Sequence, residues 1–212
     1  MIVASILLAL AADAWWDGVQ DRRDQREAVS LLRADLSSDS LQLTGLTRTI
    51  ATRDSAAAWF LRNRTRPDPP PDSVRLMVAR IYTLDRYPRP RAAYLTLRDS
   101  GRLDLIRDDE IRVALVQYFE QVQVQLVQQF SDWLAVREHV ITQLNPHARP
   151  SAPSSLRSTG PREYDPNWAW DEIRADDELM MLLIRYGGLA SDIAAQADGQ
   201  RAVTGRLSAA LE

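Results

Sequence analysis

Residues 19–62 contain no proline, and their apolar side chains recur at a spacing of seven. One position of this repeat is fully apolar: Val29, Leu36, Leu43, Ile50 and Ala57. The position three residues further on is mostly apolar: Leu32, Asp39, Leu46, Arg53 and Phe60. This pattern predicts a long amphipathic helix with a coiled-coil-like seam. At the helical rise per residue, such a helix extends about 65 Å.

Two charged residues, Asp39 and Arg53, interrupt the seam. In some coiled coils a polar seam residue fixes register or selects a partner, so both are candidates for interaction with a second protein or a second copy of the chain. Alternatively, the seam faces water at these points, or each residue pairs with a neighbouring helix. The pattern leaves open whether the seam is filled within the chain or by a partner.

Proline-rich segments separate this helix from the next one. "RTRPDPPPD" (residues 64–72) is incompatible with helix interior and ends the first helix. Asp72 is a good N-cap residue for a helix over "SVRLMVARIYTL". In that segment Val74, Met77, Val78 and Ile81 fall on one face, which predicts that this face is buried.

The middle of the chain reads as a short helix, a turn and a second long helix. The short helix covers residues 90–100, and Gly101 follows its end as a C-terminal cap. Apolar residues of "SGRLDLI" are expected to lie beneath the turn. Asp108 or Asp109 then caps a helix that continues to about Leu144.

The C-terminal third combines a loop with a final helix. Residues 145–168 are rich in Pro, Ser, Gly and Arg, which predicts a long surface loop. Helical periodicity resumes near Trp170, and Gly187-Gly188 is a point where this helix would kink or break. No segment has convincing strand character. We therefore expect an all-α chain, with a long antiparallel helical bundle over residues 17–212.

Residues 1–16, "MIVASILLALAADAWW", are strongly apolar. A full membrane span needs about 20 apolar residues, and this segment falls short of that length. Its small residues offer cleavage sites of the signal-peptide type, but no basic residues precede the apolar run. Trp15 and Trp16 are followed directly by charged residues, which is typical of an interfacial belt leading into water. We expect a partial transmembrane anchor, whose first turns are lost to a late start codon or to trimming.

Two segments resemble a family of uncharacterised bacterial single-pass membrane proteins. "ASILLALAADAWWDGVQDRRDQREAVSLLRADLSSD" is similar to the family's N-terminal span, of the type "GILIALQINNWNE", and the charged helix behind it. "YLTLRDSGRLDLIRDD" matches a family segment of the form Tyr-x-x-Leu-x-x-Ser-Gly-x-Leu-x-Leu-Ile-x-Asp. The resemblance implies a membrane anchor with an all-helical domain behind it. The family has no known activity and no catalytic residues to carry over.

Composition and motifs give few signs of chemistry. A net charge of −3 provides no general attraction to nucleic acid, and the absence of Cys excludes thiolate ligands and nucleophiles. No catalytic motif or Gly-rich phosphate loop occurs. The chain has two histidines, His139, which lies near Glu138 and Asp132, and His147. These groups are too few to form a metal or hydrolytic site, which needs more side chains that converge. We expect no cofactor, metal or catalytic residue.

The segment "YDPNWAWDE" (residues 164–172) contains two tryptophans with two opposed interpretations. Trp168 and Trp170 are candidates for anchoring a partner or resting on a membrane interface. Alternatively, they cover the end of the bundle beneath the loop.

These features predict a membrane-anchored helical bundle that acts by protein interaction: sensing, scaffolding or assembly. It binds membrane lipid through residues 1–16, as a single-pass protein of the bacterial inner membrane. The orientation signals conflict. A cytoplasmic bundle is favoured by the basic residues just after the anchor, Arg22, Arg23 and Arg26. A bundle outside the cytoplasm is favoured by the basic N-terminus usual in the family, and we prefer this orientation. Two alternatives are an enzyme that uses carboxylates or His within the bundle, and a secreted soluble bundle with a cleaved signal peptide.

Overall fold

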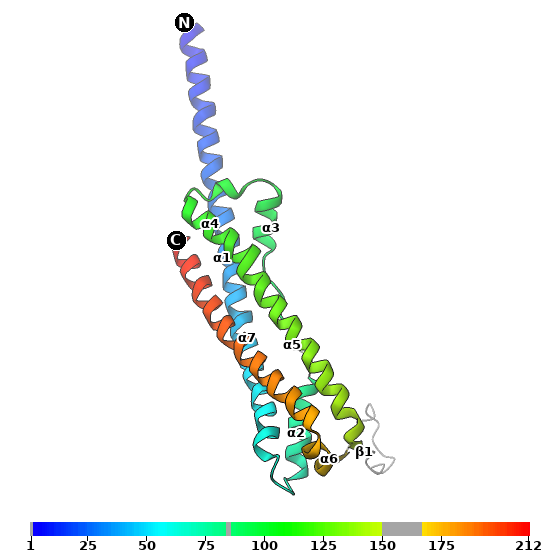
Figure 1. Cartoon of the computed structure of the whole chain (residues 1–212). Coiled ribbons are helices and arrows are strands. Elements are labelled where there is room, and N and C mark those ends of the chain that lie inside the picture. The colour runs from blue at the N-terminus through cyan, green and yellow to red at the C-terminus, as the bar shows by residue number, and fades with distance from the viewer. Residues whose placement is uncertain (1, 84–85, 150–166) are drawn as a thin grey trace, which may run out of the picture. The chain divides into compact units, whose positions relative to one another are not determined.

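The computed structural model describes residues 2–83, 86–149 and 167–212, and this part of the chain is all-α apart from one two-residue strand pair (Figure 1). The elements are, in chain order, α1 (Ile2–Asn63), α2 (Pro71–Tyr82), α3 (Ala92–Asp99), η1 (Leu103–Leu105), α4 (Asp109–Gln117), η2 (Tyr118–Val122), α5 (Gln123–Leu144), η3 (Asn145–His147), β1 (Ala148–Arg149), β2 (Asn167–Trp168), α6 (Trp170–Ala175) and α7 (Asp177–Ala210). The predicted all-α helical bundle is confirmed.

The chain divides into two compact units, and the long helices contribute to both. Unit 1 comprises Met1–Leu43, Pro88–Val124 and Gly199–Glu212. Unit 2 comprises Thr44–Tyr87 and Gln125–Asp198. Both rows of the heptad seam lie in the core: Val29 is half-buried, and every other member is buried. The seam is therefore filled by side chains of the same chain.

Unit 1 packs the first part of α1 against α3, α4 and the end of α7. Its core includes Leu32 and Leu36 of α1, Tyr94 of α3, Phe119 of η2 and Leu207 of α7. Burial of such large apolar side chains stabilises the unit by about 1.5–3 kcal/mol each.

Side chains and one glycine define the helix ends in unit 1. Asp35 of α1 caps the start of α3, because its carboxylate accepts hydrogen bonds from the backbone N–H groups of Ala93 (2.8 Å) and Tyr94 (3.2 Å). Gly101 ends α3 with a φ of 68°, a conformation that glycine adopts without steric cost. Asp108 then caps α4 through the N–H groups of Glu110 and Ile111. The expected caps at both ends of the "SGRLDLI" turn are confirmed.

Unit 2 packs the second part of α1 antiparallel to α7. Thr47 contacts Asp198, and Arg64 forms an ion pair with Asp177, so positions further along α1 meet positions earlier in α7. On α2, the predicted apolar face is buried: Val74, Met77, Val78 and Ile81.

In unit 2, the close approach of α7 to α1 explains why position 187 is a glycine. A Cβ added to Gly187 would lie 3.0 Å from Asp54 Oδ1 and 3.8 Å from Ala57 Cβ of α1. Small size at this position therefore allows α7 to approach α1. The expected break at Gly187-Gly188 is wrong: α7 continues through both residues, because a glycine only weakens a helix that tertiary packing holds.

Two further expectations need correction. Asp72 is not the N-cap of α2; the cap is Pro70, and Asp72 lies in the first turn, 3.3 Å from Arg75. Pro71 supplies a helical φ and lacks the N–H that would need a partner, so the helix starts there. The predicted loop over residues 145–168 contains a strand pair at its ends, since Ala148 pairs with Trp168 and Arg149 with Asn167. Residues 150–166 lie outside the described part.

Candidate functional site

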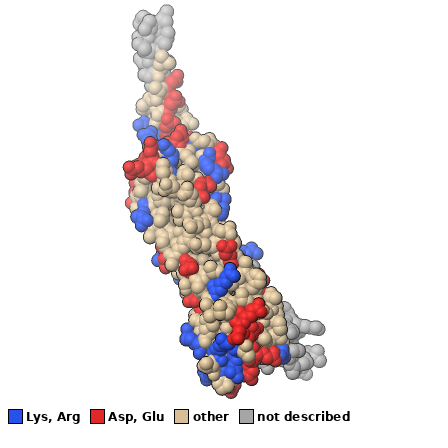
Figure 2. Space-filling model, viewed as in Figure 1, with Lys and Arg blue, Asp and Glu red and all other residues tan. Residues whose placement is uncertain are grey.

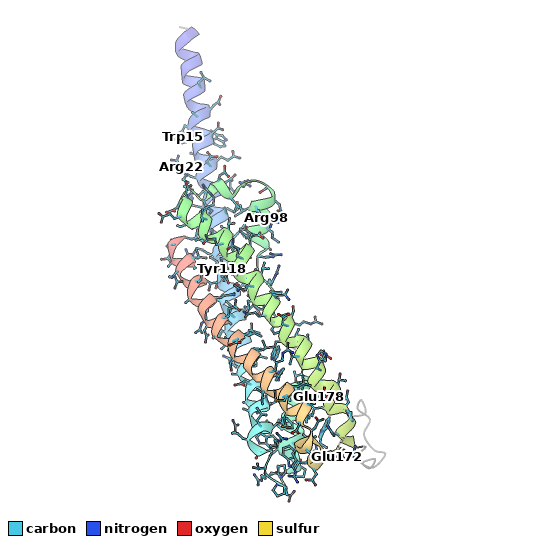
Figure 3. The ribbon with its side chains drawn as sticks, in the orientation of Figure 1. Trp15, Arg22, Arg98, Tyr118, Glu172 and Glu178 are labelled. Atoms are coloured by element: carbon cyan, nitrogen blue, oxygen red, sulfur yellow. The ribbon has the colours of Figure 1, made fainter. Side chains whose placement is uncertain are left out.

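The first part of α1 carries large apolar side chains that face solvent. Leu10 is 60% exposed, Trp15 64% and Trp16 62%. Figure 3 shows Trp15 on the portion of α1 that precedes the packed core of unit 1, followed by Arg22. Among the described residues, no helix has an apolar stretch that is long enough to cross a bilayer. Exposed indoles next to charged residues are nevertheless the pattern found where a helix meets a membrane surface.

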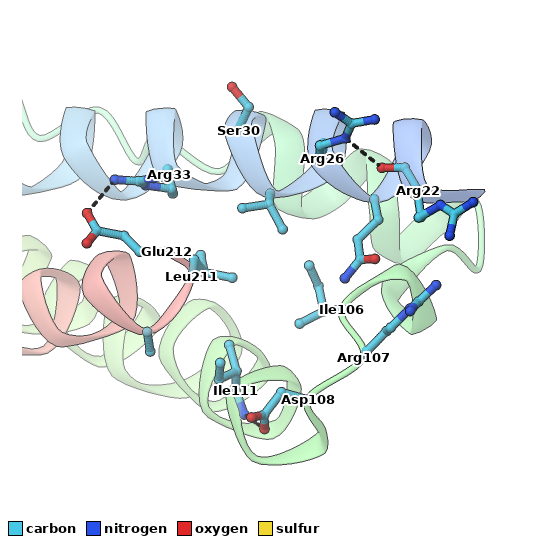
Figure 4. A pocket seen from close by; sticks show the side chains of 13 residues that line it. Arg22, Arg26, Ser30, Arg33, Ile106, Arg107, Asp108, Ile111, Leu211 and Glu212 are labelled. Atoms are coloured by element: carbon cyan, nitrogen blue, oxygen red, sulfur yellow. Dashed lines mark hydrogen bonds and ion pairs between the residues drawn. The ribbon is translucent and has the colours of Figure 1, made fainter. Parts of the chain in front are cut away.

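A cavity of about 800 Å³ lies in unit 1 directly after this apolar portion (Figure 4). Its walls come from α1, from the turn before α4 and from the end of α7. The lining residues of this arginine cavity are Arg22, Gln25, Arg26, Val29, Ser30, Arg33, Ile106, Arg107, Asp108, Ile111, Ala210, Leu211 and Glu212. Its volume falls within the range of about 300–1,000 Å³ that is usual for small-molecule sites.

The guanidinium groups of this cavity differ in how they are paired. Arg33 forms an ion pair of 2.8 Å with Glu212, and Arg26 donates from Nε to the backbone carbonyl of Arg22 at 3.1 Å. Arg22 and Arg107 form no ion pair with any residue that the structure describes. Asp108 already accepts two backbone N–H groups of α4. The cavity therefore has cationic groups available for an anion.

The surroundings of the cavity are mixed in charge. Asp24 on α1 pairs with Arg102 at 2.6 Å, and Figure 2 shows basic and acidic side chains close together on this part of unit 1. The cavity lining itself contains four arginines and two carboxylates, those of Asp108 and Glu212.

The candidate seam residue Asp39 lies in the core of unit 1, fully buried. Its carboxylate accepts hydrogen bonds from the hydroxyl of Tyr118 and from Gln123 Nε2, the latter at 3.1 Å. Figure 3 places Tyr118 in this interior. Of the interpretations open to the sequence, pairing with a neighbouring helix is the one that the structure shows for Asp39.

A π-helical turn, η2, aligns both partners of Asp39. Tyr118 begins this turn and Gln123 follows its end. Gln200 of α7 donates from Nε2 to the carbonyl of Val122 at 2.8 Å, which adds a partner for a backbone group of the irregular turn. π-turns are rare and recur at functional sites. The sequence predicts a regular α-helix in this stretch, and no local signal in it marks the extra residue.

Arg53, the second polar residue of the seam, lies in unit 2 and is 6% exposed.

Another arginine of unit 2, Arg137, was not recognised from the sequence. It is 4% exposed and donates to the backbone carbonyls of Ile81, at 2.8 Å, and Tyr82. These are the last carbonyls of α2, so Arg137 satisfies groups that a helix C-terminus leaves without partners.

The two candidate tryptophans lie at one end of unit 2. Trp170 is 8% exposed, donates from Nε1 to the carbonyl of Arg66 at 2.7 Å, and packs against Trp59 with ring centroids 5.5 Å apart. Trp168 is half-buried, and its ring lies 6.1 Å from that of Tyr82. The structure thus places both indoles in packing contacts at the bundle end. A smaller cavity of about 410 Å³ lies beside them.

The two histidines occupy unrelated positions. His139 is exposed and its Nδ1 lies 2.9 Å from the carbonyl of Ala135. His147 is closer to acids: Nε2 lies 3.1 Å from Asp176 and Nδ1 lies 3.5 Å from Glu172. Among the described residues, no group of three or more His, Asp or Glu is arranged to hold a metal ion.

Two carboxylates near His147 have lowered pKa values. Partial burial raises the pKa of Asp176, but hydrogen bonds from the Leu179 N–H and from His147 outweigh it, so the net shift is downward. The hydrogen bond from Arg149 has the largest effect on the pKa of Glu172 and lowers it, desolvation raises it by less, and the hydrogen bond with His147 lowers it further. Both carboxylates are thus held in their charged form.

The arginine cavity was only partly visible in the sequence. In the sequence, Arg22 and Arg26 bear on the orientation of the anchor, whereas no local pattern marks Arg107 as a site residue. Arg107 lines the cavity from the turn that precedes α4. Comparison with protein-family models, with curated proteins and with solved structures found no match to this chain.

Proposed function

We propose that this chain is a membrane-anchored helical bundle that acts by protein interaction, in sensing, scaffolding or assembly, and has no catalytic role of its own. Its anchor is the first part of α1, which enters the bacterial inner membrane, and its bundle lies outside the cytoplasm. The resemblance to single-pass membrane proteins of unknown activity supports the same proposal.

The observation that carries the proposal is the exposure of Trp15 and Trp16 on α1. Burying a large apolar side chain stabilises by about 1.5–3 kcal/mol, so a bilayer surface that covers both indoles would contribute several times the thermal energy. A tryptophan side chain also keeps its N–H hydrated at the headgroup level while its ring enters the apolar layer. The charged residues that follow remain in water.

Alkaline carbonate extraction of membranes from bacteria that express the full chain tests the anchor. A membrane-inserted helix resists this treatment because its apolar burial does not depend on charge, whereas peripheral proteins are released. We expect the chain in the membrane pellet. Recovery in the supernatant would contradict the proposal.

Tryptophan quenching in vesicles locates the contact. Phosphatidylcholine brominated near the headgroup should quench the fluorescence of the reconstituted wild-type chain, and the W15F/W16F variant should lose most of that quenching. Trp133 and Trp170 are buried in unit 2, so they serve as unquenched internal controls. Equal quenching of both proteins would show that these two indoles do not meet the bilayer.

A further inference from the structure

We propose that the arginine cavity of unit 1 binds the headgroup of one anionic phospholipid from the membrane that α1 enters. The inference rests on the proposed function and adds a defined lipid ligand to it. It stands on three features of the cavity: its unpaired cations, its apolar floor and its place along α1.

The cationic side of the cavity fits a phosphodiester. Arg22 and Arg107 approach from different elements, α1 and the turn before α4, and neither forms an ion pair with another described residue. A guanidinium group offers paired N–H donors that match two phosphate oxygens. Two such groups on opposite walls hold one phosphate better than a single surface arginine does.

The floor of the cavity is apolar. Ile106 is 3% exposed and Leu211 7%, while Val29 and Ile111 are partly buried and pack on the same core. Figure 4 shows Ile106, Ile111 and Leu211 facing the space between the helices. Val29 lies seven residues beyond Arg22 along α1, about 10 Å further from Trp16, so the carbons of the headgroup beyond the phosphate would cover this surface while the acyl chains remain in the bilayer. Cations beside an apolar floor distinguish a phosphodiester that carries an organic headgroup from free phosphate.

The position along α1 supplies the third argument. Trp16 and Arg22 are six residues apart, about 9 Å along the helix axis. The headgroup layer is about 5–7 Å thick on each side of the hydrocarbon core, so the backbone of Arg22 lies about 2–4 Å beyond it when Trp16 lies at the boundary of the core and the helix is upright. The long arginine side chains extend back toward the phosphates.

Binding of short-chain lipids to the full chain in non-ionic detergent tests the inference by calorimetry. The probes are dihexanoyl phosphatidylglycerol, dihexanoyl phosphatidylcholine and inorganic phosphate. We expect one site for phosphatidylglycerol, with phosphatidylcholine and phosphate each at least tenfold weaker. Equal binding of the two lipids would overturn the role of the arginines, and phosphate binding as tight as that of phosphatidylglycerol would overturn the lipid.

Matched variants locate the site. R22Q/R107Q should weaken phosphatidylglycerol binding about 25-fold, since each arginine near an anionic lipid contributes about fivefold, or about 1 kcal/mol. R23Q/R48Q removes the same charge from exposed positions of α1 outside the cavity and should change binding less than twofold. Similar affinity of R22Q/R107Q and wild type would exclude the cavity.

The two proposals fail in different ways. Retention of the chain by pure phosphatidylcholine vesicles, without saturable binding of phosphatidylglycerol, would leave the anchor intact and overturn the lipid site. Saturable phosphatidylglycerol binding by a chain that carbonate releases from membranes would overturn the anchor instead. Circular dichroism of each variant confirms that the helical content is unchanged.

Discussion

Replacing Tyr118 with Phe removes one hydroxyl from the buried contact with Asp39. The ring remains, and with it the edge-to-face contact with Phe119 at 5.1 Å, so no cavity opens. A hydrogen bond to a charged group contributes about 1.5–3 kcal/mol, and its loss leaves a buried carboxylate with one partner fewer. We expect Y118F to lower the free energy of unfolding by about 2 kcal/mol.

A double-mutant cycle separates this contact from other effects of the hydroxyl. Asn in place of Asp39 keeps the shape but removes the charge, so the hydrogen bond from Tyr118 falls to the neutral value of about 1 kcal/mol. Y118F should therefore cost about 1 kcal/mol less in the D39N background than in the wild type. This difference is the coupling energy of the pair.

The assay is urea unfolding of the four proteins at neutral pH in non-ionic detergent, followed by far-UV circular dichroism. Tryptophan fluorescence provides a second probe, and coincident transitions support two-state treatment. A loss below about 0.5 kcal/mol for Y118F in both backgrounds would refute the reasoning. In that case the pair would not stabilise the core of unit 1.

Two further predictions concern unit 2 and its end. G188A should raise the free energy of unfolding by about 0.5–1 kcal/mol, because Ala favours the helix and its Cβ meets nothing within 4 Å. G187A should raise it by less, because the added Cβ lies 3.0 Å from Asp54 Oδ1. Equal urea midpoints of the two variants would contradict the close approach of α7 to α1. The lowered pKa of Asp176 contributes stability that is present above pH 3.8, its ordinary pKa, and is lost as the pH falls through the lowered value. Wild type should therefore lose its advantage over D176N as the pH falls below 3.8, and a pH-independent difference in urea midpoint would contradict the linkage.

The periodic apolar residues were sufficient to predict the helices, because burial of one face is a local property of the pattern. Leu36, Leu43 and Ile50 recur every seven residues and are fully buried. The caps Asp108 and Gly101 were predictable for the same reason, since they act on neighbouring backbone, whereas the predicted cap Asp72 was wrong because α2 begins at Pro71. The wrong prediction of a helix break at Gly187 shows the limit of local patterns. The role of Gly187 depends on Asp54 and Ala57, which are far away in the sequence.

The candidate sites were harder to predict, because their residues come from separate helices. Asp39 was visible as an exception in the seam, but its partners Tyr118 and Gln123 are aligned by a π-turn that periodicity cannot show. Arg107 likewise reaches the arginine cavity through the geometry of a turn. Spacing within one segment contains no information about such encounters.

The burial of the seam changes where a partner of this chain can bind. Coiled-coil spacing suggested a surface for a second copy, yet the seam residues of α1 are covered within each unit by the chain's own helices. Opening it would expose side chains such as Leu36 and Leu43, each of which contributes about 1.5–3 kcal/mol. A protein partner would therefore meet exposed apolar side chains outside the seam, such as Leu41 of α1, 71% exposed, and Met181 of α7, 65% exposed. The heptad pattern of α1 is thus a signature of internal packing.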